Sequence, residues 1–128
     1  MKAVLLGLCL LAPLPAQALE RYVCHLETLC TSKGCKTVKP DFANPHVFEY
    51  DSGATTGVLK FHGQVFDLQV FEEPFVVSFL DRMEQGFRGF AIDRTQLSMV
   101  ATRTDPNFPT FHRGTCEQDL ALGPDLSR

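Results

Sequence analysis

The sequence predicts an all-β protein, a small antiparallel up-and-down β-barrel of about eight strands, with a β-sandwich as the alternative. Apolar and polar residues alternate along most of the chain, and no window of about 11 residues carries the apolar stripe of a helix. Turn-forming residues recur roughly every 8 to 12 positions, as they do in all-β domains. Because the turns are short, we expect consecutive strands to pair in chain order, which favours the barrel.

Residues 1–18 have the pattern of a secretory signal peptide. Lys2 precedes an apolar run, and Ala16-Gln17-Ala18 supplies a cleavage site of small residues, so we expect the mature chain to begin at Leu19. The apolar run is shorter than the roughly 20 residues that cross a bilayer, and we expect no transmembrane segment. A lipoprotein anchor on Cys9 is disfavoured because Leu8, a large residue, precedes it. The predicted location is periplasmic or extracellular.

The mature chain is predicted to be one domain over residues 19–117, with a loose tail over residues 118–128. Loss of the signal lowers Lys+Arg from 12 to 11 against 15 Asp+Glu, which gives a formal charge of −4. This acidic balance argues against nucleic acid and anionic membranes as partners. All 11 phenylalanines lie in the mature part and tryptophan is absent, so we expect a phenylalanine-rich core.

Four cysteines remain after the signal, an even number that indicates two disulfides in a secreted chain of this size. Three connectivities are possible. Cys30 and Cys35 flank a four-residue segment that ends in Gly34, and residues facing each other across a hairpin are close enough to bridge. We therefore predict a Cys30–Cys35 bridge, which leaves Cys24 for Cys116. The bridge that closes the longer loop is expected to stabilise the fold more.

Three strands are predicted before the first clear hairpin, over residues 21–26, 35–39 and 47–51. Tyr22, Cys24 and Leu26 share one face of the first strand, which predicts a half-buried strand. Pro40 ends the second, because proline cannot donate a hydrogen bond to a neighbouring strand. The third strand ends at a turn signal that begins at Asp51.

Residues 57–61 and 64–71 form the clearest hairpin in the chain. They are joined by His62-Gly63, a two-residue loop suited to positive φ at Gly63. In this register Leu59 faces Phe66, and the apolar faces of the two strands agree.

Four further strands are predicted over residues 75–83, 87–93, 95–103 and 112–117. The first carries apolar residues on both faces, which predicts a central strand with Phe75, Val77 and Phe79 on one side. Residues 104–111 contain two prolines and are predicted to be a loop.

The histidines give little support for a metal site. His25, His46, His62 and His112 are scattered, whereas zinc sites typically use ligand pairs at short spacing. His25 and His112 would approach each other if a disulfide joins their strands, so a two-histidine surface site is an alternative to ordinary exposed histidines. We expect no metal and no cofactor.

No catalytic constellation is visible in the sequence. There is no Gly-x-Ser-x-Gly motif, and disulfides would remove the cysteines as nucleophiles. Glu72, Glu73 and Asp81 could suggest a carboxylate pair, but neighbouring residues at a proline-marked corner point in different directions, so a solvated acidic corner is favoured. We expect no catalytic residues and a non-enzymatic protein.

Two groups of residues are candidate binding sites. Arg94, Arg103 and Arg113 could form one anion site, because guanidinium groups match carboxylate and phosphate, although separate positions on the strands are the favoured interpretation. Phe108 and Phe111 lie in the proline-stiffened loop and could anchor a partner, because rigid aromatic side chains lose little entropy on binding. The favoured alternative is that this pair covers the open end of the barrel.

Tyr22-Val23-Cys24, the strand over residues 57–61 and the closing Gly114-Thr115-Cys116 make the chain similar to small secreted bacterial β-proteins of largely uncharacterised families. In plan it resembles the MliC-type periplasmic inhibitors of C-type lysozyme, which are β-barrels whose first and last strands are joined by a disulfide. The chain departs from that family by its lack of tryptophan, its additional Cys30/Cys35 hairpin and the absence of a Ser-Ala-Ser-Gly segment. No inhibitory residue is therefore carried over.

These observations predict a secreted, non-enzymatic binding or inhibitor module whose ligand is a protein or a small molecule. A small hydrolase or metal-dependent enzyme and a structural envelope component are the alternatives. A deep pocket lined by phenylalanine with one or two polar groups would favour a small ligand, and a filled core with an exposed aromatic loop would favour a protein partner. The sequence leaves the ligand and the oligomeric state open.

Overall fold

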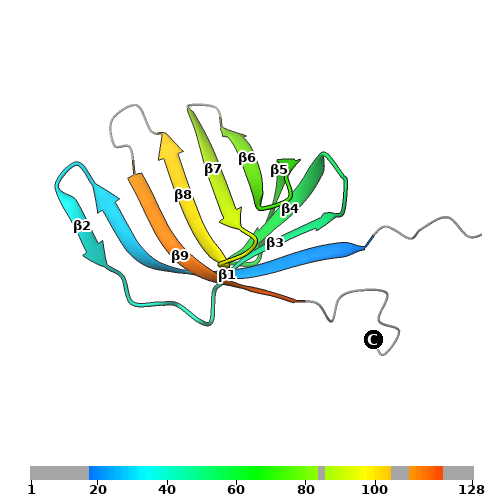
Figure 1. Ribbon diagram of the computed structural model, residues 1–128. Coiled ribbons are helices and arrows are strands. Elements are labelled where there is room, and N and C mark those ends of the chain that lie inside the picture. The colour runs from blue at the N-terminus through cyan, green and yellow to red at the C-terminus, as the bar shows by residue number, and fades with distance from the viewer. Residues whose placement is uncertain (1–17, 84–85, 105–109, 120–128) are drawn as a thin grey trace, which may run out of the picture.

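The computed structural model describes residues 18–83, 86–104 and 110–119, and these residues form an all-β fold (Figure 1). Eight strands close into an antiparallel barrel and one short strand lies outside it, which confirms the predicted barrel. Within the described ranges, no helix is long and apolar enough to cross a membrane. The strands are β1 (Leu19–Thr31), β2 (Gly34–Thr37), β3 (His46–Asp51), β4 (Thr56–Phe61), β5 (Gln64–Glu72), β6 (Val76–Met83), β7 (Gly86–Asp93), β8 (Ser98–Thr104) and β9 (Thr110–Gln118).

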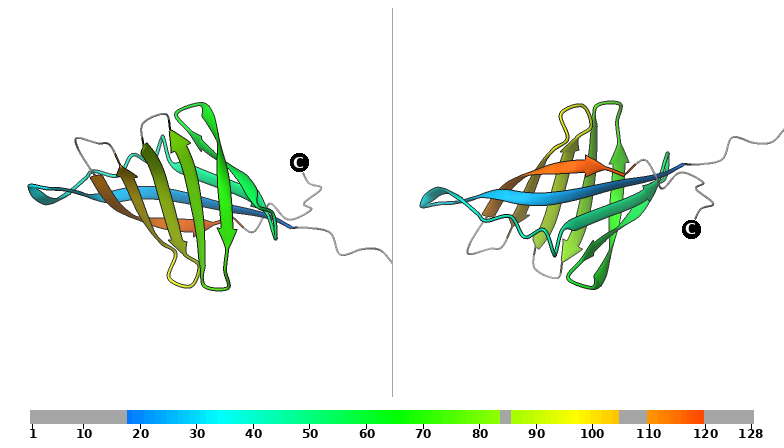
Figure 2. Two further views of the ribbon diagram at one scale, coloured as in Figure 1. Left: turned by 90° about the horizontal axis from the view of Figure 1, so that it is seen from above. Right: turned by 90° about the horizontal axis from the view of Figure 1, so that it is seen from below.

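Strands β3 to β9 pair in chain order, as the short turns predict, and β1 closes the barrel between β3 and β9 (Figure 2). At 13 residues, β1 is longer than the strand predicted over residues 21–26. Its first half pairs with β3, and its last residues pair with β2 in a hairpin that projects from the barrel (Figure 1). Strand β2 is therefore an appendage of β1 and not part of the barrel wall.

Two disulfides join register partners on neighbouring strands, with the predicted connectivity. Cys24 on β1 lies opposite Cys116 on β9, and their sulfur atoms are 2.04 Å apart. Cys30 lies opposite Cys35 across the β1–β2 hairpin. The first bridge is buried and joins the two strands that close the barrel.

A β-bulge in β1 decides which of its later residues face the interior. The pairing with β9 shifts by one residue between Leu26 and Thr28, so Leu29 continues the inward face of Leu26 while Cys30 faces outward. The two strands approach closely here. A Cβ atom on Gly114 would lie 2.2 Å from the carbonyl oxygen of His25, which explains why this position is a glycine.

Each barrel strand contributes inward side chains to one filled core. Only the inward residues nearest one end of the barrel are left out of it. Its largest fully buried members are Tyr22, Phe48, Leu59, Phe79, Ile92 and Met99. Phe48 packs between two other phenylalanines, with ring centroids 4.7 Å from Phe79 and 5.0 Å from Phe90. Leu59 pairs with Phe66, as the hairpin register predicts, and Gly63 has a φ of 72°.

The predicted position of Phe75 is wrong. Phe75 precedes β6 and is 73% exposed, whereas the alternation had placed it on the buried face with Val77. The N–H of Glu73 donates to the carbonyl of Val76, and the N–H of Arg94 donates to the carbonyl of Phe75. These bonds hold the residue in a tight connection between strands.

Strand β8 begins at Ser98, not at the predicted residue 95. The carboxylate of Asp93 accepts hydrogen bonds from the N–H groups of Thr95 and Gln96, which makes a turn of this segment. Leu97 ends the turn with a φ of 56°, a conformation outside the β region.

Candidate functional site

A hollow of about 510 Å³ lies at one end of the barrel, and we call it the mouth pocket. Its wall includes Leu26, Phe61, Arg88, Phe90, Ala101 and Arg103. This volume is within the range of small-ligand pockets. An eight-stranded barrel is just wide enough to be filled by side chains or to hold one small ligand, and this barrel is filled below the pocket and hollow within it.

The lower wall of the mouth pocket is apolar. Phe61 lies two residues beyond the buried Leu59, so both side chains point to the same side of β4. Phe90 and Ala101 are register partners on β7 and β8, and both are buried. The contact of Phe90 with Phe48 connects this wall to the core, so the pocket has an apolar floor.

A row of charged side chains crosses the upper wall. Asp81, Arg88 and Arg103 are register partners on β6, β7 and β8. Each lies two residues beyond a buried, inward-facing residue, namely Phe79, Phe90 and Ala101. Side chains alternate along a strand, so the row faces the barrel interior.

Arg88 and Arg103 have different surroundings. Both Nε and Nη2 of Arg88 donate to the Asp81 carboxylate, with Nε at 3.1 Å, and the guanidinium lies 4.6 Å from the centroid of the Phe66 ring. For Arg103, by contrast, no carboxylate partner is found among residues 18–83, 86–104 and 110–119. The row therefore carries one positive charge in excess.

Two histidines complete the polar part of the pocket, and both favour the neutral form. His46 stacks on Phe61 with ring centroids 3.9 Å apart. Burial, followed by the charges of His112 and Arg88, lowers the pKa of His46 to about 4. Burial also lowers the pKa of His112, whose Nδ1 is buried with no hydrogen-bond partner in the described ranges.

The opposite end of the barrel is closed by a connected polar network. The carboxylate of Glu72 accepts hydrogen bonds from the Tyr50 hydroxyl at 3.1 Å and from the Gly53 N–H at 2.8 Å. Arg94 approaches Glu72 at 3.5 Å and Glu20 at 3.9 Å. Burial raises the pKa of Tyr50, which keeps its hydroxyl protonated as a donor. The prediction of a solvated acidic corner is therefore wrong for Glu72.

The structure separates the three arginines that were considered as one anion site. Arg94 lies in the turn between β7 and β8 and belongs to the closed end, whereas Arg103 lies near the end of β8 and borders the mouth pocket. Arg113 is exposed on the outer face of β9, 5.5 Å from the Phe111 ring centroid. A shared site is therefore wrong, and only Arg103 borders the pocket.

The aromatic pair is placed only in part, because Phe108 lies outside the described residues. Phe111 belongs to β9, which begins at Thr110 and not at the predicted residue 112. Its partners are Cys30 and Thr102, on the outer side of the wall. Phe111 therefore does not cover the open end of the barrel, and the role of Phe108 stays a prediction.

The two-histidine surface site is also wrong. His25 faces outward, where its ring lies 4.8 Å from that of Phe42, whereas His112 lines the mouth pocket. The barrel wall lies between them. In the part of the chain that the structure describes, no three His, Cys, Asp or Glu side chains form a group that could hold a metal ion.

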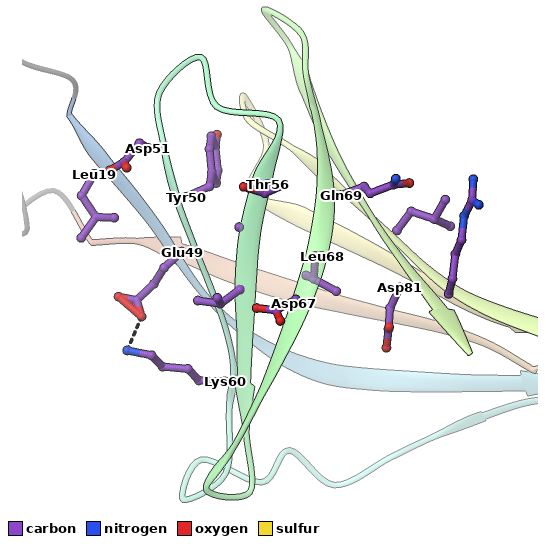
Figure 3. A pocket seen from close by; sticks show the side chains of 14 residues that line it. Leu19, Glu49, Tyr50, Asp51, Thr56, Lys60, Asp67, Leu68, Gln69 and Asp81 are labelled. Carbon is purple, nitrogen blue, oxygen red and sulfur yellow. Dashed lines mark ion pairs between the residues drawn. The ribbon is translucent and has the colours of Figure 1, made fainter. Parts of the chain in front are cut away.

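A second hollow, of about 820 Å³, lies over the outer face of β3 to β6. Figure 3 shows that its side chains are spread along the strands, and that Glu49 and Lys60 point toward each other. This groove carries a charge pair that is already matched. The mouth pocket, in contrast, is lined by side chains that face the barrel interior and has an apolar floor, so it is the better candidate site.

Comparison with protein-family models, curated proteins and solved structures found no match. The function is therefore argued from the residues of the mouth pocket. Arg88 was missed as a site residue from the sequence, and Asp81 was considered only as part of a carboxylate pair. The available signal was a charged residue two positions from an apolar core residue on each of three consecutive strands.

Proposed function

We propose that the protein is a secreted, non-enzymatic binding module that holds a small ligand with an apolar body in the mouth pocket. The observation that carries this proposal is a hollow of about 510 Å³ above a filled core, bordered by Phe61, Phe90 and the two arginines Arg88 and Arg103. This is the combination of phenylalanine and a few polar groups that favours a small ligand over a protein partner.

The polar groups of the pocket support binding over catalysis. Asp81 is engaged by Arg88, and within the described ranges neither His46 nor His112 has a carboxylate partner that would orient it as a base. The pocket thus offers an apolar surface and an unmatched cation, which are properties of a binding site.

Secretion is part of the proposal and rests on two observations. Residues 1–18 have the pattern of a signal peptide, and two disulfides are compatible with an oxidising compartment. The bridge between first and last strands is also the feature that the chain shares in plan with the MliC-type inhibitors. Inhibition of a protein partner is the alternative proposal, for which Phe108 and Phe111 are the predicted anchors.

The binding of a neutral apolar dye tests the proposed function. We expect N-phenyl-1-naphthylamine to bind the mature protein and to gain fluorescence, because its rings match the Phe61 and Phe90 wall. The chain has no tryptophan that would interfere with this signal. Absence of a saturable fluorescence increase would contradict the proposal.

A substitution that fills the pocket gives the specific control. Ala101→Phe adds a ring at an inward position of β8, and we expect it to lower dye affinity at least about tenfold by excluding the dye from the hollow. Val100→Phe adds the same ring at the neighbouring outward position and should leave affinity within about twofold. Circular dichroism of both variants checks that they fold.

A further inference from the structure

The charged row of the mouth pocket breaks a rule of strand pairing. Arg88 and Arg103 are direct register partners on the same inward face, where two like charges destabilise the sheet. One carboxylate, Asp81, accompanies the two guanidinium groups, and it contacts Arg88. Departures from local consistency are expected at functional sites, because a bound ligand can supply the opposite charge.

From this arrangement we infer that the ligand is an amphipathic monocarboxylate, whose carboxylate is bound by Arg103 beside Arg88 and whose apolar body lies against Phe61 and Phe90. The inference deepens the proposed function and rests on it. It assigns the class of ligand and the residue that recognises its charged group.

The anionic group follows from the geometry of the row. A guanidinium presents parallel N–H donors that match a carboxylate, and Arg103 has them available as far as the described residues show. Arg88 cannot turn toward a ligand as freely, because it is held by Asp81 and packed on Phe66. Thr110, the register partner of Arg103 on β9, also borders the pocket and brings a hydroxyl donor.

A single negative charge fits better than two. Asp81, Arg88 and Arg103 together carry a net charge of one positive unit, which a carboxylate neutralises. A phosphate monoester would bring nearly two negative charges close to Asp81 and leave an excess of negative charge. The histidines of the pocket do not supply the difference, because both favour the neutral form.

The apolar body follows from the remaining wall. Below the charged row lie Leu26, Phe61 and Phe90, and Phe90 packs on the fully buried Phe48 of the core. A ligand that carried polar groups along its whole length would leave them without partners against this wall. The pocket therefore selects a molecule with its charge at one end.

Titration calorimetry with three eight-carbon ligands tests the inference on the mature, folded protein. Octanoate, 1-octanol and octyl phosphate share one apolar body and differ in the group at its end. We expect octanoate to bind at least about tenfold more tightly than either of the others, since a tenfold ratio corresponds to one matched charged contact. Equal affinity for octanoate and 1-octanol, or a preference for octyl phosphate, would overturn the assignment.

Variants of Arg103 identify the residue. Arg103→Gln should lower octanoate affinity at least about tenfold and leave 1-octanol within about twofold, while Arg103→Lys, which keeps the charge, should lose less. Arg113→Gln removes an outward-facing arginine of the adjacent strand and should change neither affinity. If Arg103→Gln behaves like Arg113→Gln, Arg103 is not the recognition residue.

Different results would contradict the carboxylate assignment and the binding module. Saturable binding of the neutral dye without preference for octanoate would contradict the carboxylate assignment and leave the binding module standing. Absence of binding of the dye and of all three eight-carbon ligands would contradict both.

Discussion

Arg88 and Arg103 lie directly opposite each other on neighbouring strands, facing the barrel interior, and only Arg88 is paired with a carboxylate in the part of the chain that the structure describes. The pair is the main electrostatic feature of the mouth pocket. Their repulsion opposes folding, so a ligand that neutralises it should both bind there and stabilise the barrel.

Removal of the Asp81 charge should strengthen anion binding. Asp81→Asn raises the net charge of the row by one unit, and we expect octanoate affinity to rise roughly three- to tenfold, as for an interaction of about 1 kcal/mol between partly exposed charges. Calorimetry measures the change. Asp67→Asn, at an exposed outward position of β5, is the matched control. Weaker octanoate binding by Asp81→Asn alone would contradict the charge balance proposed for the row.

The two disulfides should contribute unequally to stability. Replacement of Cys24 and Cys116 together by alanine opens a bridge across 92 residues, and the chain-entropy model gives a loss of about 4 to 5 kcal/mol in the free energy of unfolding. The same change at Cys30 and Cys35 opens a bridge across 5 residues and should cost about 2 kcal/mol. Urea unfolding of both double variants measures the difference.

Mild reduction gives an independent check on the same bridges. Cys35 is exposed, whereas Cys24 and Cys116 are both buried, so a thiol reagent should open the β1–β2 hairpin bridge first. Mass spectrometry after alkylation of partly reduced protein identifies the modified cysteines. Earlier labelling of Cys116 would show that the barrel closure is more accessible than its burial indicates.

Stability should fall as the pH is lowered through the titration range of His46. Burial and the nearby His112 and Arg88 lower its pKa from 6.5 to about 4 in the folded state, with smaller effects of His62 and His25. The unfolded chain takes up a proton near pH 6.5, which the folded protein resists. The stabilising contribution is therefore complete above about pH 6.5 and is lost as the pH falls toward 4.

Two variants isolate this effect. His46→Phe keeps a ring against Phe61, and we expect its free energy of unfolding to depend less on pH between about pH 7 and 4.5 than that of the unchanged protein. His62→Asn alters an exposed turn residue of φ 50°, a conformation that asparagine tolerates, and should keep most of the dependence, because His62 is a smaller cause of the low pKa of His46 than burial. Identical pH profiles for His46→Phe and the unchanged protein would show that His46 is not held neutral.

Truncation of a phenylalanine in the filled core should lower the stability of the protein, whereas truncation of the exposed phenylalanine before β6 should not. Phe79→Ala removes a ring that packs on Phe48, and we expect a loss of about 3 to 5 kcal/mol in the free energy of unfolding. Phe75→Ala removes an exposed ring four residues earlier and should change stability by no more than about 0.5 kcal/mol. Chemical denaturation compares the two, and a large loss for Phe75→Ala would mean that this side chain packs in solution.

Much of the fold could be predicted because local rules act on it directly. Alternation places Leu59 opposite Phe66, and the short His62-Gly63 turn fixes their register. The spacing of Cys30 and Cys35 identifies their bridge, and with it the closure of the barrel by Cys116. These features depend on a few neighbouring residues and on the alternation of inward and outward side chains along each strand.

The predictions fail where one detail of the backbone changes the alternation of inward and outward side chains. The bulge after Leu26 turns Cys30 outward, and its register partner Phe111 faces the same way. The Asp93 turn delays β8 to Ser98, although the alternation continues through Leu97. A pattern of apolar residues does not reveal an inserted residue in a strand, nor a turn that is held by one carboxylate.

The candidate site was harder to predict than the fold, because its residues come together only when the barrel closes. Arg103 was singled out with Arg94 and Arg113 on chemical type, yet the three occupy different ends and faces of the wall. Arg88 becomes significant only as its register partner. The mouth pocket is identified by the register across three strands, and the sequence alone does not give that register.

An NMR titration with octanoate tests the central claim most directly, because it locates the ligand on the protein. In two-dimensional ¹H–¹⁵N spectra we expect the largest shifts at Phe61, Arg88, Phe90 and Arg103, with Arg94 at the closed end unchanged. Shifts that gather on the outer groove around Glu49 and Lys60, or spectra that do not change on saturation with octanoate, would contradict a carboxylate site in the mouth pocket.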